Sequence, residues 1–218
     1  MKDYLAEFIG TFALVFAITA TIVGTVGVNS GFGVLNLLAI AFTAGLVLMV
    51  LIFTFGPLSG AHFNPAVTIG LWFAGKFQKK KVIPYLIAQF AGGLAASLAL
   101  WVLVFDPNLG ATTAGSYGTT TALLAEIVAT ALFLIVILSV TGRKESQSHA
   151  PFAIGFYLLV AHLYAIPFSG ASLNPARSLG PALFDGGTAL NQLWIYFLGP
   201  VIGALLGAII YQMLMKKN

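Results

Sequence analysis

Long apolar segments separated by short polar ones dominate the pattern along this chain. A membrane-spanning helix needs about 20 consecutive, mostly apolar residues, and six segments approach or reach that length. The fifth is short and is expected to extend a little at one end. The pattern therefore predicts six spans, over residues 4–27, 34–57, 82–105, 121–142, 150–168 and 192–215.

Two further apolar stretches, residues 65–74 and 175–184, are too short to cross a membrane. Ten helical residues measure about 15 Å, which is half of the hydrocarbon thickness. Asn is a favoured N-cap and Pro is favoured at the first helical position, so an Asn-Pro step predicts the start of each half-helix. The two Asn-Pro-Ala triplets are Asn64, Pro65 and Ala66, and Asn174, Pro175 and Ala176.

The chain also resembles itself. Each half holds three predicted spans, an odd number, so the second half would enter the membrane from the opposite face. The sequence thus predicts one domain over residues 1–218, built as an inverted repeat of about 1–105 and about 121–218. The two half-helices would meet N-terminus to N-terminus near the midplane. The matching pairs of segments are 4–14 with 123–133, 59–66 with 169–176, and 85–92 with 196–203.

Composition indicates a membrane protein with little room for a soluble domain. Of the 218 residues, 59% are apolar and 7% are charged, whereas a soluble domain has about 25% charged residues. Soluble enzymes, nucleic-acid-binding proteins and secreted disulfide scaffolds are therefore excluded. The sequence shows no cysteine, hydrolytic triad, phosphate loop or metal-spaced cluster, so we expect no enzyme, cofactor or metal. No Ala-x-Ala cleavage site follows the first residues, so the first span is expected to be retained.

The basic residues predict the orientation. With six spans, nine of the ten Lys and Arg residues fall on one side, together with both termini. Cytoplasmic loops retain Lys and Arg, so this side is expected to be cytoplasmic. The outer loops near 28–33, 106–120 and 185–191 contain neither, and Arg177 is the exception. The nine residues are Lys2, Lys76, Lys79, Lys80, Lys81, Arg143, Lys144, Lys216 and Lys217.

With these motifs the sequence resembles the aquaporin, or major intrinsic protein, family over essentially its whole length. The strongest elements are His-Phe-Asn-Pro-Ala-Val-Thr at 62–68 and Asn-Pro-Ala-Arg-Ser at 174–178. The resemblance implies an all-α membrane fold of six transmembrane helices plus two re-entrant half-helices. It also implies a passive channel that conducts water in single file, excludes protons and ions, and assembles as a homotetramer in the lipid bilayer. The short termini favour a prokaryotic inner membrane.

The two Asn loops themselves favour a channel for neutral molecules. Two facing helix N-termini place about half a positive charge each at the midplane, which repels cations. The carboxamide NH₂ groups of Asn64 and Asn174 can donate to one water oxygen from one side. That water then cannot also accept from both neighbours, so the hydrogen-bonded chain that relays protons is broken. The broken helices alone would also fit an ion-coupled transporter that uses buried carboxylates and histidines.

The resemblance implies a selectivity filter of Ala44, His162, Ala171 and Arg177. Arg177 would donate hydrogen bonds to the solute and repel cations; a structural salt bridge is the alternative interpretation. His162 would face this arginine, and a plain core histidine is its alternative. Ungapped counting selects Ala44 as the third member, and Phe42, two residues away, would face in another direction.

The small filter residues leave the substrate open. Water-selective members of the family usually carry Phe where this chain has Ala44, so two alanines imply a wider mouth. The alternative function is a facilitator of small uncharged solutes such as glycerol, ammonia, urea or hydrogen peroxide. Ser178 follows the filter arginine where glycerol-conducting members carry Asp, which favours water.

The remaining candidates support the pore. Glu7 and Glu126 occupy equivalent points of the repeat, inside spans. A proton relay is one interpretation; the favoured one is that each accepts hydrogen bonds from the backbone of a re-entrant loop, because hydrocarbon offers no acceptor. The resemblance places the backbone of both loops along the pore. The loop residues are Gly60, Ala61, His62 and Phe63, and Gly170, Ser172 and Leu173.

Overall fold

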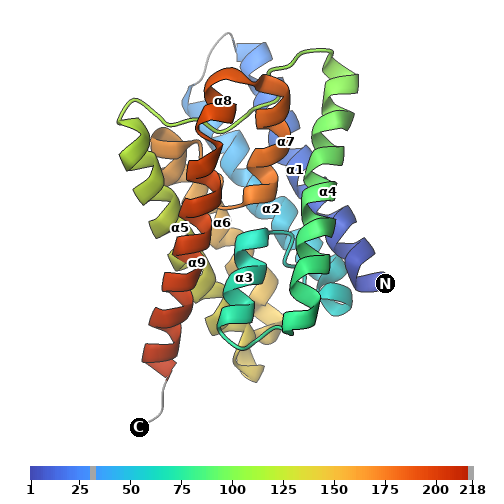
Figure 1. The fold of residues 1–218 in the computed structure, drawn as a ribbon, viewed down its shortest axis with the longest axis vertical. Coiled ribbons are helices and arrows are strands. Elements are labelled where there is room, and N and C mark those ends of the chain that lie inside the picture. The colour runs from blue at the N-terminus through green and yellow to red at the C-terminus, as the bar shows by residue number, and fades with distance from the viewer. Residues whose placement is uncertain (30–32, 216–218) are drawn as a thin grey trace.

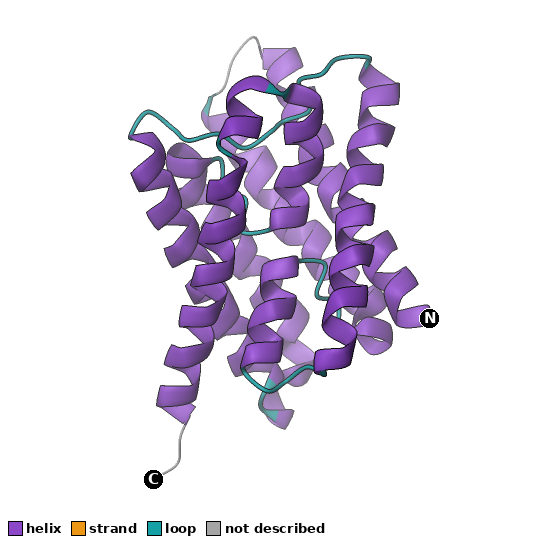
Figure 2. Ribbon diagram, in the orientation of Figure 1, coloured by secondary structure: helices purple, strands orange, loops and turns teal. Residues whose placement is uncertain are grey.

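Helices make up all the regular structure in the described part of the chain, which comprises residues 1–29 and 33–215 of the computed structural model (Figure 2). Six of them are long and apolar enough to cross a membrane, so the predicted all-α membrane fold is confirmed. The predicted boundaries hold to within a few residues. The six are α1 (Lys2–Asn29), α2 (Val34–Ser59), α4 (Lys79–Val104), α5 (Gly118–Thr141), α6 (Ala150–Ser169) and α9 (Leu193–Met215).

Of two short helices, one matches the sequence prediction and one does not. The 3₁₀ helix η1 (Lys144–His149) runs directly into α6, which gives the fifth span its expected extension. The helix α8 (Gly187–Asn191) lies in a segment that was predicted to be a plain outer loop. Residues 30–32 of the first outer loop, and Lys216 and Lys217, lie outside the described residues.

The two half-helices are α3 (Pro65–Phe73) and α7 (Pro175–Asp185), as the Asn-Pro steps predict. Figure 1 shows α3 in the lower half of the molecule and α7 in the upper half, so that together they have about the length of one span. In each, Asn is the N-cap and Pro is the first helical residue. Neither half-helix crosses the molecule alone, and their N-terminal ends meet inside it.

The two halves of the chain pack in the same way. Helix α1 packs on α4 in the first half, and α5 packs on α9 in the second. Between α2 and α6, which come from different halves, a Cβ on Gly45 would lie 2.6 Å from the carbonyl oxygen of Gly155, and one on Gly155 would lie 2.7 Å from that of Gly45. Small residues of this kind let membrane helices approach closely. The reciprocal contact is what an inverted repeat produces at its axis.

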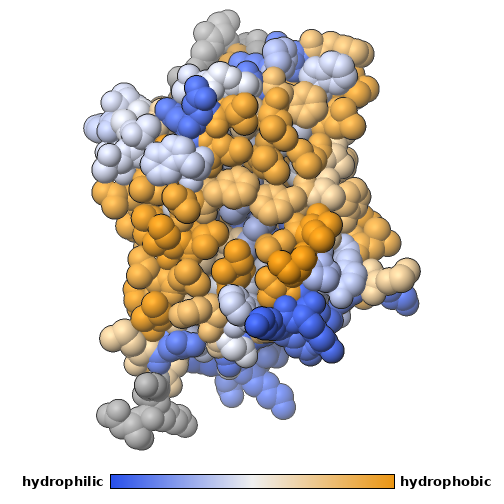
Figure 3. Space-filling view, in the orientation of Figure 1, coloured by the Kyte–Doolittle hydropathy of each residue, from blue (hydrophilic) through white to orange (hydrophobic). Residues whose placement is uncertain are grey.

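The outer surface suits a bilayer. Figure 3 shows a broad apolar region over the middle of the molecule, with polar side chains gathered toward its two ends. Large exposed side chains such as Phe42, Phe53 and Phe156 contribute to the apolar surface. We call the end with the loop after α3 and the segment between α5 and α6 the basic face, because it carries Lys76, Lys79, Lys80, Arg143 and Lys144.

The close contact between α5 and α9 gives a first prediction. A Cβ on Gly203 would meet the carbonyl oxygen of Ile127, with Thr130 Cβ at 3.0 Å. We expect Gly203→Ala to lower the free energy of unfolding by about 1–3 kcal/mol, because the helices must separate. Thermal unfolding in detergent measures it. Gly24→Ala is the matched control, since a Cβ at Gly24 meets nothing within 4 Å; equal losses in both variants would contradict the prediction.

Candidate functional site

The two Asn-Pro-Ala loops are joined by reciprocal hydrogen bonds. Asn64 Nδ2 donates to the carbonyl oxygen of Leu173 at 2.7 Å, and Asn174 Nδ2 donates to that of Phe63 at 2.9 Å. The Oδ1 of each Asn accepts from the backbone of its own half-helix, at 2.9 Å from Ala66 N for Asn64. Each NH₂ group therefore uses one hydrogen in the cross-link and keeps the other for a further acceptor.

The loops that lead to the half-helices adopt an irregular backbone. Ala61, Phe63, Ala171 and Leu173 all have φ values between 49° and 53°. This left-handed region is unfavourable for residues with a Cβ. The same positions are affected in both loops, so the conformation belongs to the repeat. Such a backbone needs hydrogen-bond partners from elsewhere in the protein.

Two buried carboxylates supply those partners. Glu7 accepts from the backbone N–H groups of His62 at 3.0 Å and Phe63 at 2.7 Å. Glu126 accepts from those of Ser172 at 2.8 Å and Leu173 at 2.7 Å. Each also accepts from a serine hydroxyl at 2.7 Å, from Ser59 and Ser169 respectively. Both side chains are fully buried, and both carboxylates are acceptors for the backbone of a re-entrant loop.

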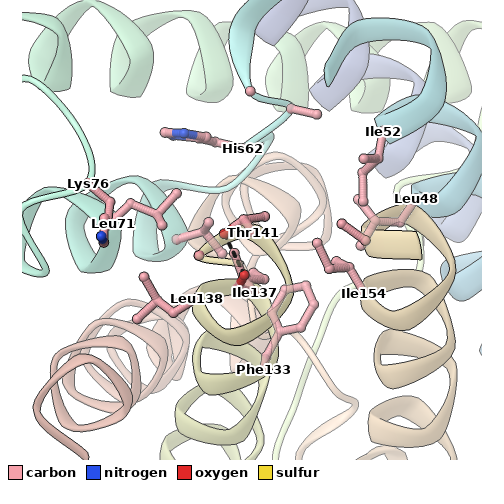
Figure 4. A pocket seen from close by; sticks show the side chains of 15 residues that line it. Leu48, Ile52, His62, Leu71, Lys76, Phe133, Ile137, Leu138, Thr141 and Ile154 are labelled. Atoms are coloured by element: carbon pink, nitrogen blue, oxygen red, sulfur yellow. Dashed lines mark hydrogen bonds between the residues drawn. The ribbon is translucent and has the colours of Figure 1, made fainter. Parts of the chain in front are cut away.

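Three cavities follow one another through the molecule. A basic-face cavity of about 370 Å³ and an opposite-face cavity of about 370 Å³ lie on either side of a central cavity of about 20 Å³. The central cavity shares Leu48, His62 and Phe133 with the first, which Figure 4 shows, and Arg177 with the second. The shared lining residues indicate a continuous path with one narrow section, which we call the constriction.

The walls of the constriction differ in chemistry. Asn64, Asn174, His162 and Arg177 bring polar groups to it, together with His62 and Ser172. The rest of the lining is apolar. A molecule in the constriction can therefore hydrogen-bond to a limited set of groups and not in every direction. The apolar lining residues are Leu14, Ile18, Leu48, Phe133, Leu158 and Leu173.

Arg177 is buried without an ion pair in the described residues. Its Nη1 donates to the carbonyl oxygen of Gly110 at 3.0 Å, and its Nε has no partner there. His162 Nδ1 lies 2.9 Å from the carbonyl oxygen of Leu158, which can only accept, so Nδ1 carries the proton. Its Nε2 is buried and unpartnered. A free donor and a free acceptor thus border the constriction.

The other two filter candidates have a different position. Ala44 and Ala171 are both fully buried, and neither lines any of the three cavities. Phe42 is 49% exposed on the outer surface, so of the two alternatives only Ala44 faces inward. Among the loop residues, Gly60, Ala61 and His62 line the basic-face cavity, and Gly170 lines the opposite-face cavity. Phe63 lies in the core.

Two parts of the site were not predicted from the sequence, namely the apolar lining of the constriction and the polar partner of Arg177. Leu14, Ile18 and Ile22 follow one another at four-residue spacing on α1 and line the constriction or the opposite-face cavity. That spacing places them on one helix face and was available in the sequence. The Gly110 carbonyl that accepts from Arg177 lies in an irregular loop, and no sequence signal points to it.

Known proteins resemble this chain along its length. The family model described as "Major intrinsic protein" matches residues 1–211. Aquaporin Z of Photorhabdus laumondii is 40% identical, over 100% of this chain and 99% of that protein. Aquaporin Z of Rhodopseudomonas palustris is 40% identical, over 98% and 93%. The solved aquaglyceroporin from Plasmodium falciparum has a TM-score of 0.84 at 24% identity, covers 96% of this chain with 94% of its own, and shows the shared fold.

The carboxylate contacts give a second prediction. Glu126→Ala leaves the N–H groups of Ser172 and Leu173 and the hydroxyl of Ser169 without their acceptor. We expect a loss of about 1–3 kcal/mol for each buried donor left unpaired. Glu126→Gln keeps one acceptor oxygen, so the loss in the free energy of unfolding should be smaller. Thermal unfolding and hydrogen exchange at the amides of residues 172 and 173 measure the effect. Equal losses in the two variants would show that acceptance by this side chain does not hold the loop.

Proposed function

The chain belongs to the major intrinsic protein family, and from this premise we propose that it is a passive channel that conducts water in single file and excludes protons and ions. It is an integral membrane protein. The observation that carries the proposal is the constriction of about 20 Å³ between two cavities of about 370 Å³. A water needs about 10–15 Å³ measured in this way. The constriction therefore has room for one water molecule at a time.

The lining of the constriction suits a moving file of water. Asn64, Asn174 and Arg177 offer donors on the polar side, and His162 offers an acceptor. The apolar wall offers neither. Water therefore replaces part of its bulk hydrogen bonding and is not held on every side. Such binding permits rapid exchange between neighbouring positions.

Two features of the constriction oppose the passage of cations. The N-terminal ends of α3 and α7 meet at the cross-linked asparagines, and each contributes about half a positive charge. Arg177 adds a full charge that no described acid neutralises by contact. Cations, hydronium included, meet a positive potential there. The free hydrogens of Asn64 and Asn174 can both donate to one water oxygen, which breaks the proton-relaying chain.

Ala44, His162, Ala171 and Arg177 are the filter we propose, with the alanines acting through their small size. Ala44 and Ala171 line none of the three cavities, whereas Ile18 and Ile22 line the path together with Arg177. A broader facilitator of glycerol, ammonia, urea or hydrogen peroxide is the second candidate function. The two small residues favour it, and the volume of the constriction favours water.

The proposal includes the setting of the channel. The protein would reside in a prokaryotic plasma membrane as a homotetramer of single-domain subunits, with the basic face and both termini in the cytoplasm. The lysines and arginines of the basic face support this orientation. No catalysis and no cofactor are part of the proposed function.

Reconstituted vesicles test the function directly. We expect proteoliposomes to shrink faster than protein-free vesicles under an impermeant osmolyte, because water passes the constriction. Under a glycerol gradient they should re-swell no faster than protein-free vesicles. Light scattering after rapid mixing measures both. Fast re-swelling in glycerol would establish the broader facilitator, and shrinkage at the protein-free rate would refute a water channel.

The apolar wall of the constriction gives a further prediction. Ile18→Ala removes side-chain volume from the narrow section. We expect glycerol permeability to rise by about tenfold or more, since a single methylene in an apolar pocket changes discrimination by at least about tenfold and this change removes three carbons. Phe42→Ala is the control, because its side chain lies on the outer surface. Equal glycerol permeabilities in Ile18→Ala and Phe42→Ala vesicles would remove Ile18 from the size barrier.

A further inference from the structure

His62 stands where the basic-face cavity meets the constriction. It lines both of these cavities, and 8% of its surface is exposed. Figure 4 shows its ring on the same side of the basic-face cavity as Leu71 and Lys76. The ring packs against Phe77 at 4.6 Å and Tyr85 at 5.2 Å between centroids. The aromatic neighbours fix the position of the ring without a hydrogen bond to it among the described residues, since the Tyr85 hydroxyl donates to the carbonyl oxygen of Ser59.

A chain of hydrogen bonds that starts at Glu7 determines which ring nitrogen of His62 is protonated. Both Glu7 oxygens face backbone N–H donors, so both are acceptors. Gln89 must therefore turn its NH₂ group toward Glu7, at 2.8 Å, because its oxygen would be repelled there. The second hydrogen of that NH₂ group goes to Thr68 Oγ1, also at 2.8 Å.

The same chain then reaches the imidazole. Thr68 Oγ1 accepts from Gln89, and its own hydrogen is directed to His62 Nδ1 at 3.0 Å. His62 Nδ1 is therefore the acceptor, and the proton of the neutral ring lies on Nε2. This Nε2 bonds to no described residue, and the ring lines both the basic-face cavity and the constriction. His62 thus offers an N–H donor to the path.

His162 has the opposite arrangement. Its Nδ1 donates to the carbonyl oxygen of Leu158, which leaves an unprotonated Nε2 at the constriction. The second half of the chain lacks two of the groups in this hydrogen-bonded chain. Ser172 stands at the repeat position of His62, and Pro200 stands at that of Gln89. The two histidines are therefore not related by the repeat.

We propose that His62 and His162 face the pore with opposite hydrogen-bonding polarity, and that the N–H of His62 is a second barrier to protons on the basic side of the asparagine pair. Gln89 and Thr68 are positioning residues that select the tautomer. The inference rests on the proposed water channel, because it needs a file of water to act on.

The orientation of that file shows what a donor at His62 does. A water held by Asn64 and Asn174 points its hydrogens away from the midplane in both directions, so each half of the file donates outward. In the half of the file that leads to His162, the outward-pointing hydrogen of the last water finds an acceptor in the unprotonated Nε2 of His162. At His62, the water accepts from its inner neighbour and from the ring N–H. Its oxygen is then fully used and is a poor acceptor for a proton from the basic-face cavity.

The tautomers can be measured without any assay of transport. The His149→Gln background removes the exposed third histidine, so ¹⁵N-labelled histidine in lipid vesicles gives signals from two imidazole rings. A further His162→Gln change assigns each signal to its residue. Solid-state ¹⁵N shifts should show Nε2–H at His62 and Nδ1–H at His162. Thr68→Val should shift His62 toward the Nδ1–H form, and Thr68→Ser should restore Nε2–H. The same tautomer at both histidines, or no response to Thr68→Val, overturns the assignment.

Proton and water fluxes test the role. A pH-sensitive dye inside vesicles gives proton flux, and light scattering gives water permeability in the same preparation. We expect the ratio of proton to water flux to rise about fivefold to tenfold in Thr68→Val, which corresponds to one lost hydrogen bond, and to return in Thr68→Ser. A changed tautomer of His62 with an unchanged ratio of proton to water flux would show that its N–H is not a barrier to protons. If the unsubstituted protein gave water flux at the level of protein-free vesicles, this would instead refute the proposed function, and the tautomer result would stand.

Discussion

The need to satisfy irregular backbone inside a bilayer governs this structure. Hydrocarbon offers no partner for a backbone N–H, so a chain that stops halfway across a membrane and returns must find acceptors within the protein. Glu7 and Glu126 provide them, each from a long helix of its own half. With the loops held in this way, the half-helices can point their N-termini at each other. The polar groups that the loops and half-helices bring to the constriction depend on this arrangement for their position.

The same constraint explains where much of the polarity of the constriction comes from. The loops take up one part of the wall and bring the asparagines, Arg177 and His62 with them. The long helices close the rest with side chains such as Ile18, Leu48 and Phe133. A helix can show only side chains, because its backbone groups are bonded within it. The loops therefore add polar groups to the path, and His162 on α6 adds another.

Much of the fold could be predicted from the sequence because its signals are local. Length and hydropathy predict the six spans, and the Asn-Pro steps predict α3 and α7 with their N-caps. Features that depend on distant contacts could not be predicted. The bond from Arg177 to the Gly110 carbonyl joins two segments without a shared pattern. Counting residues along the sequence indicates that Ala44 faces the interior of the protein. Whether its side chain reaches the cavity surface depends on the neighbouring helices, so the sequence could not predict it.

The cross-link between Asn64 and Asn174 has a consequence for the origin of the chain. Each asparagine bonds to the carbonyl that precedes the other, so the contact is isologous, as in a twofold dimer. Two copies of a three-span ancestor, inserted in opposite directions, could form both bonds with no further residue. Fusion would then preserve an existing interface and free each copy to diverge. The difference between Gln89 and Pro200 at equivalent repeat positions is one such divergence.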